Sequence, residues 1–118
     1  MVVLADSVRY NAIYFRLLAS PMTELERLQS WYRDQCNEDW EHSFGVKIDT
    51  LDNPGWTLTI DLRETDLTGR SFASLSRGDS EEDANWIRCK VEQEQFIGAG
   101  GAENLTELLR VFLSWAGR

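Results

Sequence analysis

The chain has 118 residues, which is the length of one domain and leaves no room for a second. Acidic residues outnumber basic ones by 20 to 12, and the net charge of -8 argues against nucleic acid as a partner, because binding to phosphates needs a basic surface. The proportions of hydrophobic residues (42%) and charged residues (27%) are ordinary for a soluble globular protein and exclude long-range disorder.

An apolar stretch near the N-terminus could be taken for a targeting signal. Arg16 interrupts it, so the uninterrupted part is shorter than the ~7–15 residues of a signal-peptide core and far shorter than the ~20 that span a membrane. The two cysteines, Cys36 and Cys89, are fewer than a small secreted domain stapled by disulfides usually carries. We therefore expect a cytoplasmic protein with reduced thiols and no membrane partner.

The first strong helix signal is a capping box. Thr23 is followed three residues later by Glu26, and this spacing predicts a helix over residues 24–36. We expect residues 1–21 to be an N-terminal extension, disordered or loosely helical, and residues 22–118 to form the domain. The apolar stripe expected to face the core consists of Leu25, Leu28, Tyr32 and Cys36, with Trp31 beside it.

Two alternating segments follow a polar elbow over residues 37–42. Residues 45–50 and 56–62 alternate apolar and polar side chains with a period of two, which predicts a β-hairpin. Between them, Pro54 presets φ at the first central position of a turn, and Gly55 would accept the positive φ that a type II turn requires at the second. The side chains expected to point inward are Val46, Ile48, Trp56, Leu58, Ile60 and Leu62.

Three further strands are expected along the chain. They cover residues 69–75, 86–92 and 95–97. An acidic loop over residues 78–85 precedes the second of them, in which Trp86 falls on the polar face. The glycine-rich run over residues 98–101 is interpreted as a break between strand and helix.

A second helix is predicted near the C-terminus. Asn104 is its expected N-cap, Glu107 stands in the capping-box position, and apolar residues recur at helical spacing as far as Ala116. No strand–helix–strand alternation occurs, so a parallel sheet is not expected. The pattern predicts a single α+β domain with an antiparallel sheet of four or five strands and an N-terminal and a C-terminal helix packed on one face.

The sequence offers few residues for catalysis or metal binding. His42 is the single histidine, and beside Glu41 it is a candidate general base. A zinc site needs three or four ligands at recognised spacing, which one histidine and two separated cysteines do not supply. Cys36 is predicted at the negative end of a helix and Cys89 in the core, and both places disfavour a thiolate. We expect no cofactor, no metal and no catalytic residue.

The negative charge is concentrated in two segments. Residues 23–41 and residues 79–95 each carry six acids and two bases. They form either a solvated surface that keeps the protein soluble or a docking surface for a basic partner. Trp40 and Trp86 are the tryptophans whose positions in the pattern predict that they face solvent. Exposed tryptophan is enriched at binding hot spots.

Several segments together resemble the immunity protein 53 family, over about residues 22–116. The run over residues 40–56 is long enough to be specific. The segments that carry the resemblance are Trp31-Tyr32-Arg33-Asp34-Gln35-Cys36, Asp39-Trp40-Glu41-His42, Gly45-Val46-Lys47-Ile48, Thr50-Leu51-Asp52-Asn53-Pro54-Gly55-Trp56, Trp86-Ile87-Arg88-Cys89 and Phe96-Ile97-Gly98-Ala99-Gly100-Gly101.

The resemblance implies a non-catalytic bacterial protein that neutralises a cognate polymorphic toxin by stoichiometric binding. We expect the protein to be a monomer or a weak dimer. The acidic charge suits a toxin with a basic active site, such as a nuclease. Two alternatives stay open: a small enzyme that uses His42 with Glu41 or a cysteine, and a housekeeping interaction domain. Some relatives carry a rhodanese-like label, but this chain lacks the alternating α/β order that a rhodanese-like sulfurtransferase would need. The expected toxin-binding residues are Glu38, Asp39, Trp40, Glu41, His42, Asp79, Glu81, Glu82, Asp83 and Trp86.

Overall fold

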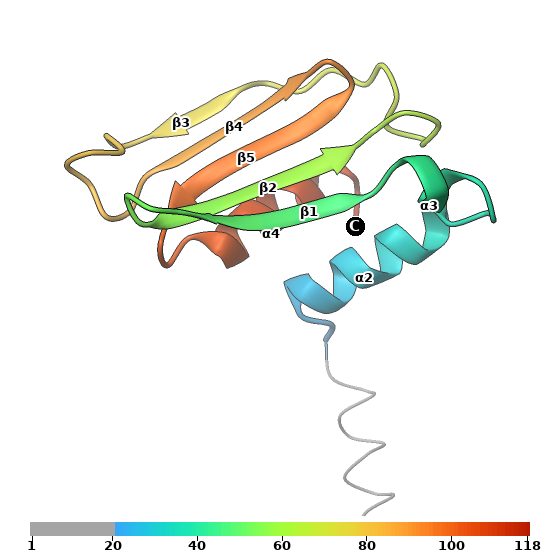
Figure 1. Cartoon of the computed structure of the whole chain (residues 1–118), viewed down its shortest axis with the longest axis horizontal. Coiled ribbons are helices and arrows are strands. Elements are labelled where there is room, and N and C mark those ends of the chain that lie inside the picture. The colour runs from blue at the N-terminus through green and yellow to red at the C-terminus, as the bar shows by residue number, and fades with distance from the viewer. Residues whose placement is uncertain (1–20) are drawn as a thin grey trace, which may run out of the picture.

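The predicted first helix is confirmed in the computed structural model, which describes residues 21–118 (Figure 1). Helix α2 spans Glu24–Gln35 and begins with the expected capping box: the Thr23 hydroxyl accepts from the Glu26 amide at 3.1 Å, and the Glu26 carboxylate accepts from the Thr23 amide. Of the extension expected over residues 1–21, all but Pro21 lies outside the described residues. No helix within the described residues is long and apolar enough to cross a membrane.

Five antiparallel strands form one sheet, in the spatial order β1-β2-β5-β4-β3. The strands are β1 (Val46–Leu51), β2 (Gly55–Asp61), β3 (Leu75–Arg77), β4 (Ile87–Glu92) and β5 (Gln95–Gly101). A short helix, α3 (Trp40–Ser43), precedes β1, and α4 (Leu105–Trp115) follows β5. The predicted α+β class is confirmed, with five strands.

The two long helices cover the same face of the sheet, as predicted (Figure 1). Aromatic rings join the layers: Phe112 of α4 packs edge-on against Phe96 of β5 and Trp31 of α2, with ring centroids 5.3 and 5.0 Å apart. All three side chains are buried. Helix α4 therefore lies between α2 and the central strands, and α2 packs mainly on α4.

This arrangement leaves the apolar stripe of α2 half covered, which corrects the prediction. Leu28 and Trp31 are buried, but Leu25 and Tyr32 are 55% and 39% exposed. Ile48, predicted to point into the core, is also 39% exposed. Because α2 packs on α4, neither helix fully covers the inner face of the edge strand β1.

The predicted third strand over residues 69–75 is wrong in position, because β3 spans Leu75–Arg77. The preceding segment covers the end of the core instead of joining the sheet. The Phe72 ring packs edge-on against Phe96 and Trp115, at 5.5 and 5.3 Å between centroids. The Trp115 indole N–H also donates to the Ser71 carbonyl at 2.9 Å.

The glycines over residues 98–101 were predicted to end the strand before the helix. They lie inside β5 instead, which pairs with β2 on one side and β4 on the other. Gly98 lies beneath α4, where an added Cβ would come within 3.3 Å of a Leu108 methyl carbon. The absence of side chains therefore lets the helix approach the sheet closely.

The predicted type II turn between β1 and β2 is also wrong. The Asn53–Pro54 bond is cis, and Gly55 is the first residue of β2 without a positive φ. Its lack of a side chain matters for another reason: a Cβ would lie 2.3 Å from the Gly100 carbonyl oxygen on the neighbouring strand. Gly55 is required by the close approach of two backbones.

Candidate functional site

The elbow over residues 37–42 is held together by hydrogen bonds among its own residues. The Asn37 side-chain oxygen accepts from the amides of Asp39 and Trp40, at 3.0 and 2.8 Å. The Glu41 carboxylate accepts from the amides of Asn37 and Glu38, both at 2.9 Å. Of the side chains in the elbow that were expected to bind a partner, the Glu41 carboxylate therefore holds the local fold instead.

Trp40 is not an exposed anchor, which corrects the sequence prediction. Its side chain is 1% exposed and its indole N–H donates to the Arg63 carbonyl at 2.8 Å. The ring lies against Trp31 and Phe44, each at 6.1 Å between centroids. Trp40 is thus a core residue that fastens the elbow to the loop after β2.

In the described part of the chain, no hydrogen bond joins the candidate catalytic side chains of His42, Glu41 and the two cysteines to one another. His42 is exposed on α3, and hydrogen bonds from the backbone, with its own amide first and then Asn37 and Glu38, hold the pKa of Glu41 below its usual value. The Cys36 thiol donates to the Tyr32 carbonyl at 3.3 Å. Burial raises the pKa of Cys89 to about 11, which favours the neutral thiol at pH 7. Within residues 21–118 no group of three or more His, Cys, Asp or Glu side chains is placed to hold a metal.

The acidic loop, residues 78–85, is clamped to the sheet by two arginines. Arg77 binds both the backbone and the side-chain oxygen of Asn85, at 3.1 and 2.8 Å, and forms a two-pronged ion pair with Glu107 of α4. Hydrogen bonding and charge from Arg77 hold the pKa of Glu107 below its usual value. Arg88 donates to the carbonyls of Arg77 and Gly78, at 3.0 and 2.6 Å.

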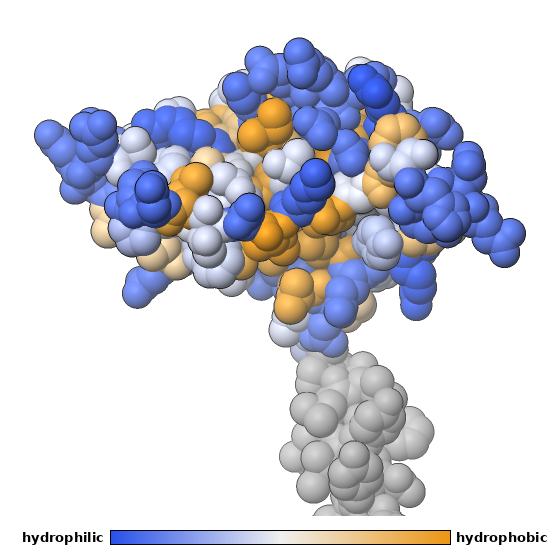
Figure 2. Space-filling view, viewed as in Figure 1, coloured by the Kyte–Doolittle hydropathy of each residue, from blue (hydrophilic) through white to orange (hydrophobic). Residues whose placement is uncertain are grey.

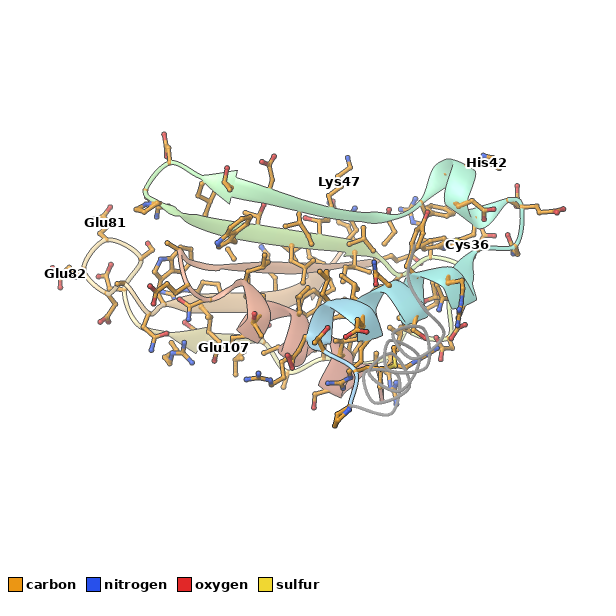
Figure 3. The ribbon with its side chains drawn as sticks, turned by 90° about the horizontal axis from the view of Figure 1, so that it is seen from below. Cys36, His42, Lys47, Glu81, Glu82 and Glu107 are labelled. Carbon is orange, nitrogen blue, oxygen red and sulfur yellow. The ribbon has the colours of Figure 1, made fainter. Side chains whose placement is uncertain are left out.

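The four loop acids predicted to bind a partner divide into two pairs with different roles. Asp79 and Asp83 hold the loop: the Asp79 carboxylate accepts from the Glu81 amide at 2.8 Å, and the Asp83 carboxylate from the Asp79 amide at 3.3 Å. The carboxylates of Glu81 and Glu82 form no hydrogen bond or ion pair with any other described residue. Both project from the far end of the molecule in Figure 3.

A hollow of about 790 Å³ opens between the acidic loop, the β1–β2 turn and the start of α4. Glu103 adds a carboxylate to the rim formed by Glu81, Glu82 and Asp83. Asn104 also lines the hollow and is the N-cap residue of α4, as predicted. Its side chain makes no capping hydrogen bond and donates instead to Asn85 and Glu107, at 2.6 and 3.2 Å. Its Oδ1 is buried and accepts no hydrogen bond among the described residues.

Trp86 at the edge of this hollow is only 5% exposed, so the prediction that it is exposed is wrong. Its carbonyl accepts from the Gly101 amide at 3.0 Å, and the Arg88 guanidinium lies 5.9 Å from the centroid of its ring. Trp86 therefore supports the acidic loop from below the surface.

The elbow and the acidic loop do not form one continuous surface. The pairing register places the start of β1 level with the end of β4, since Val46 is opposite Ile60, Ile60 opposite Phe96, and Phe96 opposite Val91. The elbow precedes β1 and the acidic loop precedes β4, so they lie at opposite ends of the sheet. Figure 3 shows this separation, with His42 at one end and Glu81 and Glu82 at the other.

Part of the hollow was missed in the sequence. Asn53 and Pro54 come from the β1–β2 turn, and Glu103 and Asn104 from the β5–α4 connection. Each looks like ordinary turn chemistry, and only the strand order brings them beside the acidic loop. Of these four residues, only Glu103 could have been suspected from the sequence, because it is a further acid near the end of a predicted strand.

One comparison with known proteins finds a family that this sequence matches. The family model described as immunity protein 53 matches residues 25–117, nearly all of the described domain. No curated protein and no solved structure matches the chain.

Proposed function

The chain belongs to the immunity protein 53 family, and from this membership we propose that it neutralises a protein toxin by binding it one-to-one. We place the contact at the acidic hollow and the adjoining loop. The toxin that suits this surface presents a basic segment, as a nuclease does where it binds phosphates. Inhibition follows from occupation of that segment and needs no catalytic group on this chain.

The observation that carries the proposal is that the carboxylates of Glu81 and Glu82, on a loop held at both ends, bind no cation among the described residues. Arg77 and Arg88 fix the ends of the loop, so little conformational entropy is lost when Glu81 and Glu82 meet a partner. Their charges are not offset by any cation bonded to them within the described residues. Such an arrangement favours fast association with a positively charged surface.

The elbow is the weaker of the two segments predicted to bind. Trp40 is buried and Glu41 is engaged with backbone amides, which leaves Glu38, Asp39 and His42 as exposed polar side chains. We therefore assign it a structural role and use it as the control.

The test compares two doubly charge-reversed proteins, using the product of the neighbouring gene, which the proposal expects to be the toxin. Glu81→Lys with Glu82→Lys changes the loop, and Glu38→Lys with Asp39→Lys changes the elbow by the same net charge. We expect the loop variant to associate about 10-fold or more slowly with the toxin, because steering by charge acts on the association rate. The elbow variant should lose much less, and the wild-type rate should fall as salt rises.

Toxin activity measured against added wild-type protein separates the function from its location. Full inhibition at equimolar protein is expected. A wild-type protein that leaves the toxin active would contradict the proposed function. Full inhibition together with equal effects of the two double variants would retain the function and reject the hollow as its site. Matching melting temperatures of the variants exclude a folding defect.

A further inference from the structure

Among the described residues, strand β1 forms a long edge of the sheet that no other element covers. It has six residues, whereas β3 at the opposite edge has three. Figure 3 shows that neither α2 nor α4 projects beyond β1. An edge strand of this kind presents backbone groups that can pair with another strand.

The hydrogen-bond pattern identifies which groups of β1 face outward. The Asp61 amide donates to the Gly45 carbonyl at 3.0 Å, which makes these two residues a hydrogen-bonded pair. Such pairs alternate along an antiparallel ladder, so the N–H and C=O groups of Val46, Ile48 and Thr50 point away from β2. The Thr50 amide is met by the Asp49 side chain at 2.8 Å, and no described residue binds the backbone groups of Val46 or Ile48.

The charges on β1 are arranged symmetrically about Ile48. Lys47 precedes it and Asp49 follows it, and both side chains lie on the face of the sheet away from the helices. In an antiparallel pair of β1 strands centred on Ile48, Lys47 of each copy stands directly opposite Asp49 of the other. Opposite charges at directly opposed positions stabilise strand pairing.

We propose that β1 pairs antiparallel with β1 of a second copy of this chain, so that two five-stranded sheets join into one. The outward groups of Ile48 then bind those of its counterpart, and Val46 pairs with Thr50. A slip of the register in either direction brings Lys47 against Lys47 or Asp49 against Asp49. Like charges at directly opposed positions destabilise the pairing. Lys47 and Asp49 therefore disfavour pairing of β1 with other strands and favour pairing with a second β1 in one register.

The apolar side of the edge fits the same partner. Ile48 is partly exposed on the inner face, and in the centred pair it contacts Ile48 of the second copy. A shallow apolar hollow of about 310 Å³ lies alongside, lined by residues of α2 and the start of β1 that include Leu28, Tyr32 and Val46. Figure 2, in which the β1 edge faces the viewer, shows apolar side chains gathered across the middle of this side between hydrophilic ends. Pairing removes part of this surface from water.

The pairing is a small interface between two chains that each carry a net charge of -8. We therefore expect a weak dimer whose population rises with protein concentration, and at very low salt the net charge opposes it. Sedimentation equilibrium at ~0.15 M salt, where charges beyond ~8 Å are screened, is the measurement of choice. No toxin is needed, so the result is independent of the proposed function.

Charge exchange at the two positions gives the decisive comparison. Lys47→Asp sets acids against acids and Asp49→Lys sets lysines against lysines, so each single variant should dimerise about 10-fold or more weakly than the wild type. The double variant, with both exchanges, restores opposite charges and should dimerise like the wild type. An equimolar mixture of the two single variants should form a mixed dimer.

Lys90→Asp is the matched control, because Lys90 lies exposed on β4, which β2 and β5 separate from β1, and the change alters the net charge equally. The ion pair that it breaks, with Glu92, is exposed and contributes little to stability. It should dimerise far better than K47D. A wild type that stays monomeric at every accessible concentration would overturn the proposal. So would a dimer that both single variants leave intact, or single variants that neither pair with each other nor recover in the double variant.

Discussion

Replacing Trp40 with alanine is expected to lower the free energy of unfolding by about 3–5 kcal/mol, the range for removing a large aromatic side chain from a core. The indole is 1% exposed and lies edge-on against Trp31 at 6.1 Å between centroids. The change also leaves the Arg63 carbonyl without the indole N–H that it binds at 2.8 Å. Both effects detach the elbow from the loop after β2.

Urea unfolding followed by tryptophan fluorescence and circular dichroism measures the loss. His42→Ala is the control, because His42 is exposed on the same short helix and should change stability by less than about 0.5 kcal/mol. If Trp40→Ala kept the wild-type stability and only sped up toxin release, Trp40 would be a surface anchor after all, and the burial described here would be contradicted.

Replacing Gly55 with valine is expected to destabilise the protein by about 3 kcal/mol or more, the upper range for overpacking a core. The Cβ atom alone would lie 2.3 Å from the Gly100 carbonyl oxygen, and both atoms belong to backbones held in the sheet. Strands β2 and β5 must separate to make room. Gly55→Ala should therefore be nearly as damaging as Gly55→Val.

Two further variants distinguish close approach from a positive φ at this glycine. Gly45→Ala is the control, since an added Cβ there has no neighbour within 4 Å. Asparagine tolerates a left-handed backbone, so Gly55→Asn would be mild if a positive φ were the reason for glycine. We expect it to be at least as harmful as alanine. A mild effect of asparagine with a severe effect of alanine would restore the type II turn.

The features that the sequence predicted correctly depend on residues close together in the chain. Thr23 and Glu26 define the start of α2 because a capping box involves only positions three residues apart. The alternation from Trp56 to Leu62 predicted β2 because strand periodicity is read within a few residues. The α+β class followed from the order of such elements.

The features that were missed depend on contacts across the fold. Trp40 is buried because its indole reaches a carbonyl 23 residues away, which no local pattern indicates. Gly98 to Gly101 form a strand rather than a break because neighbours on both sides and α4 above leave little room for side chains. The separation of the two acidic segments follows from the strand order, which a single sequence does not specify.

The proposed β1 pairing bears on this separation. Antiparallel strands place the start of one β1 beside the end of the other. The elbow of one copy would then stand at the end of the sheet where the second copy carries its acidic hollow. Two acidic segments that lie at opposite ends of one chain would then lie at the same end of the joined sheet.

The most direct test of the central claim, that the acidic hollow is where a toxin is held, is a hydrogen-exchange comparison of the free protein with its toxin complex. We predict slower amide exchange over residues 79–86 and 102–104, with residues 38–43 unchanged. Slower exchange over residues 38–43, with the acidic loop unaffected, would contradict the account and return the binding site to the elbow.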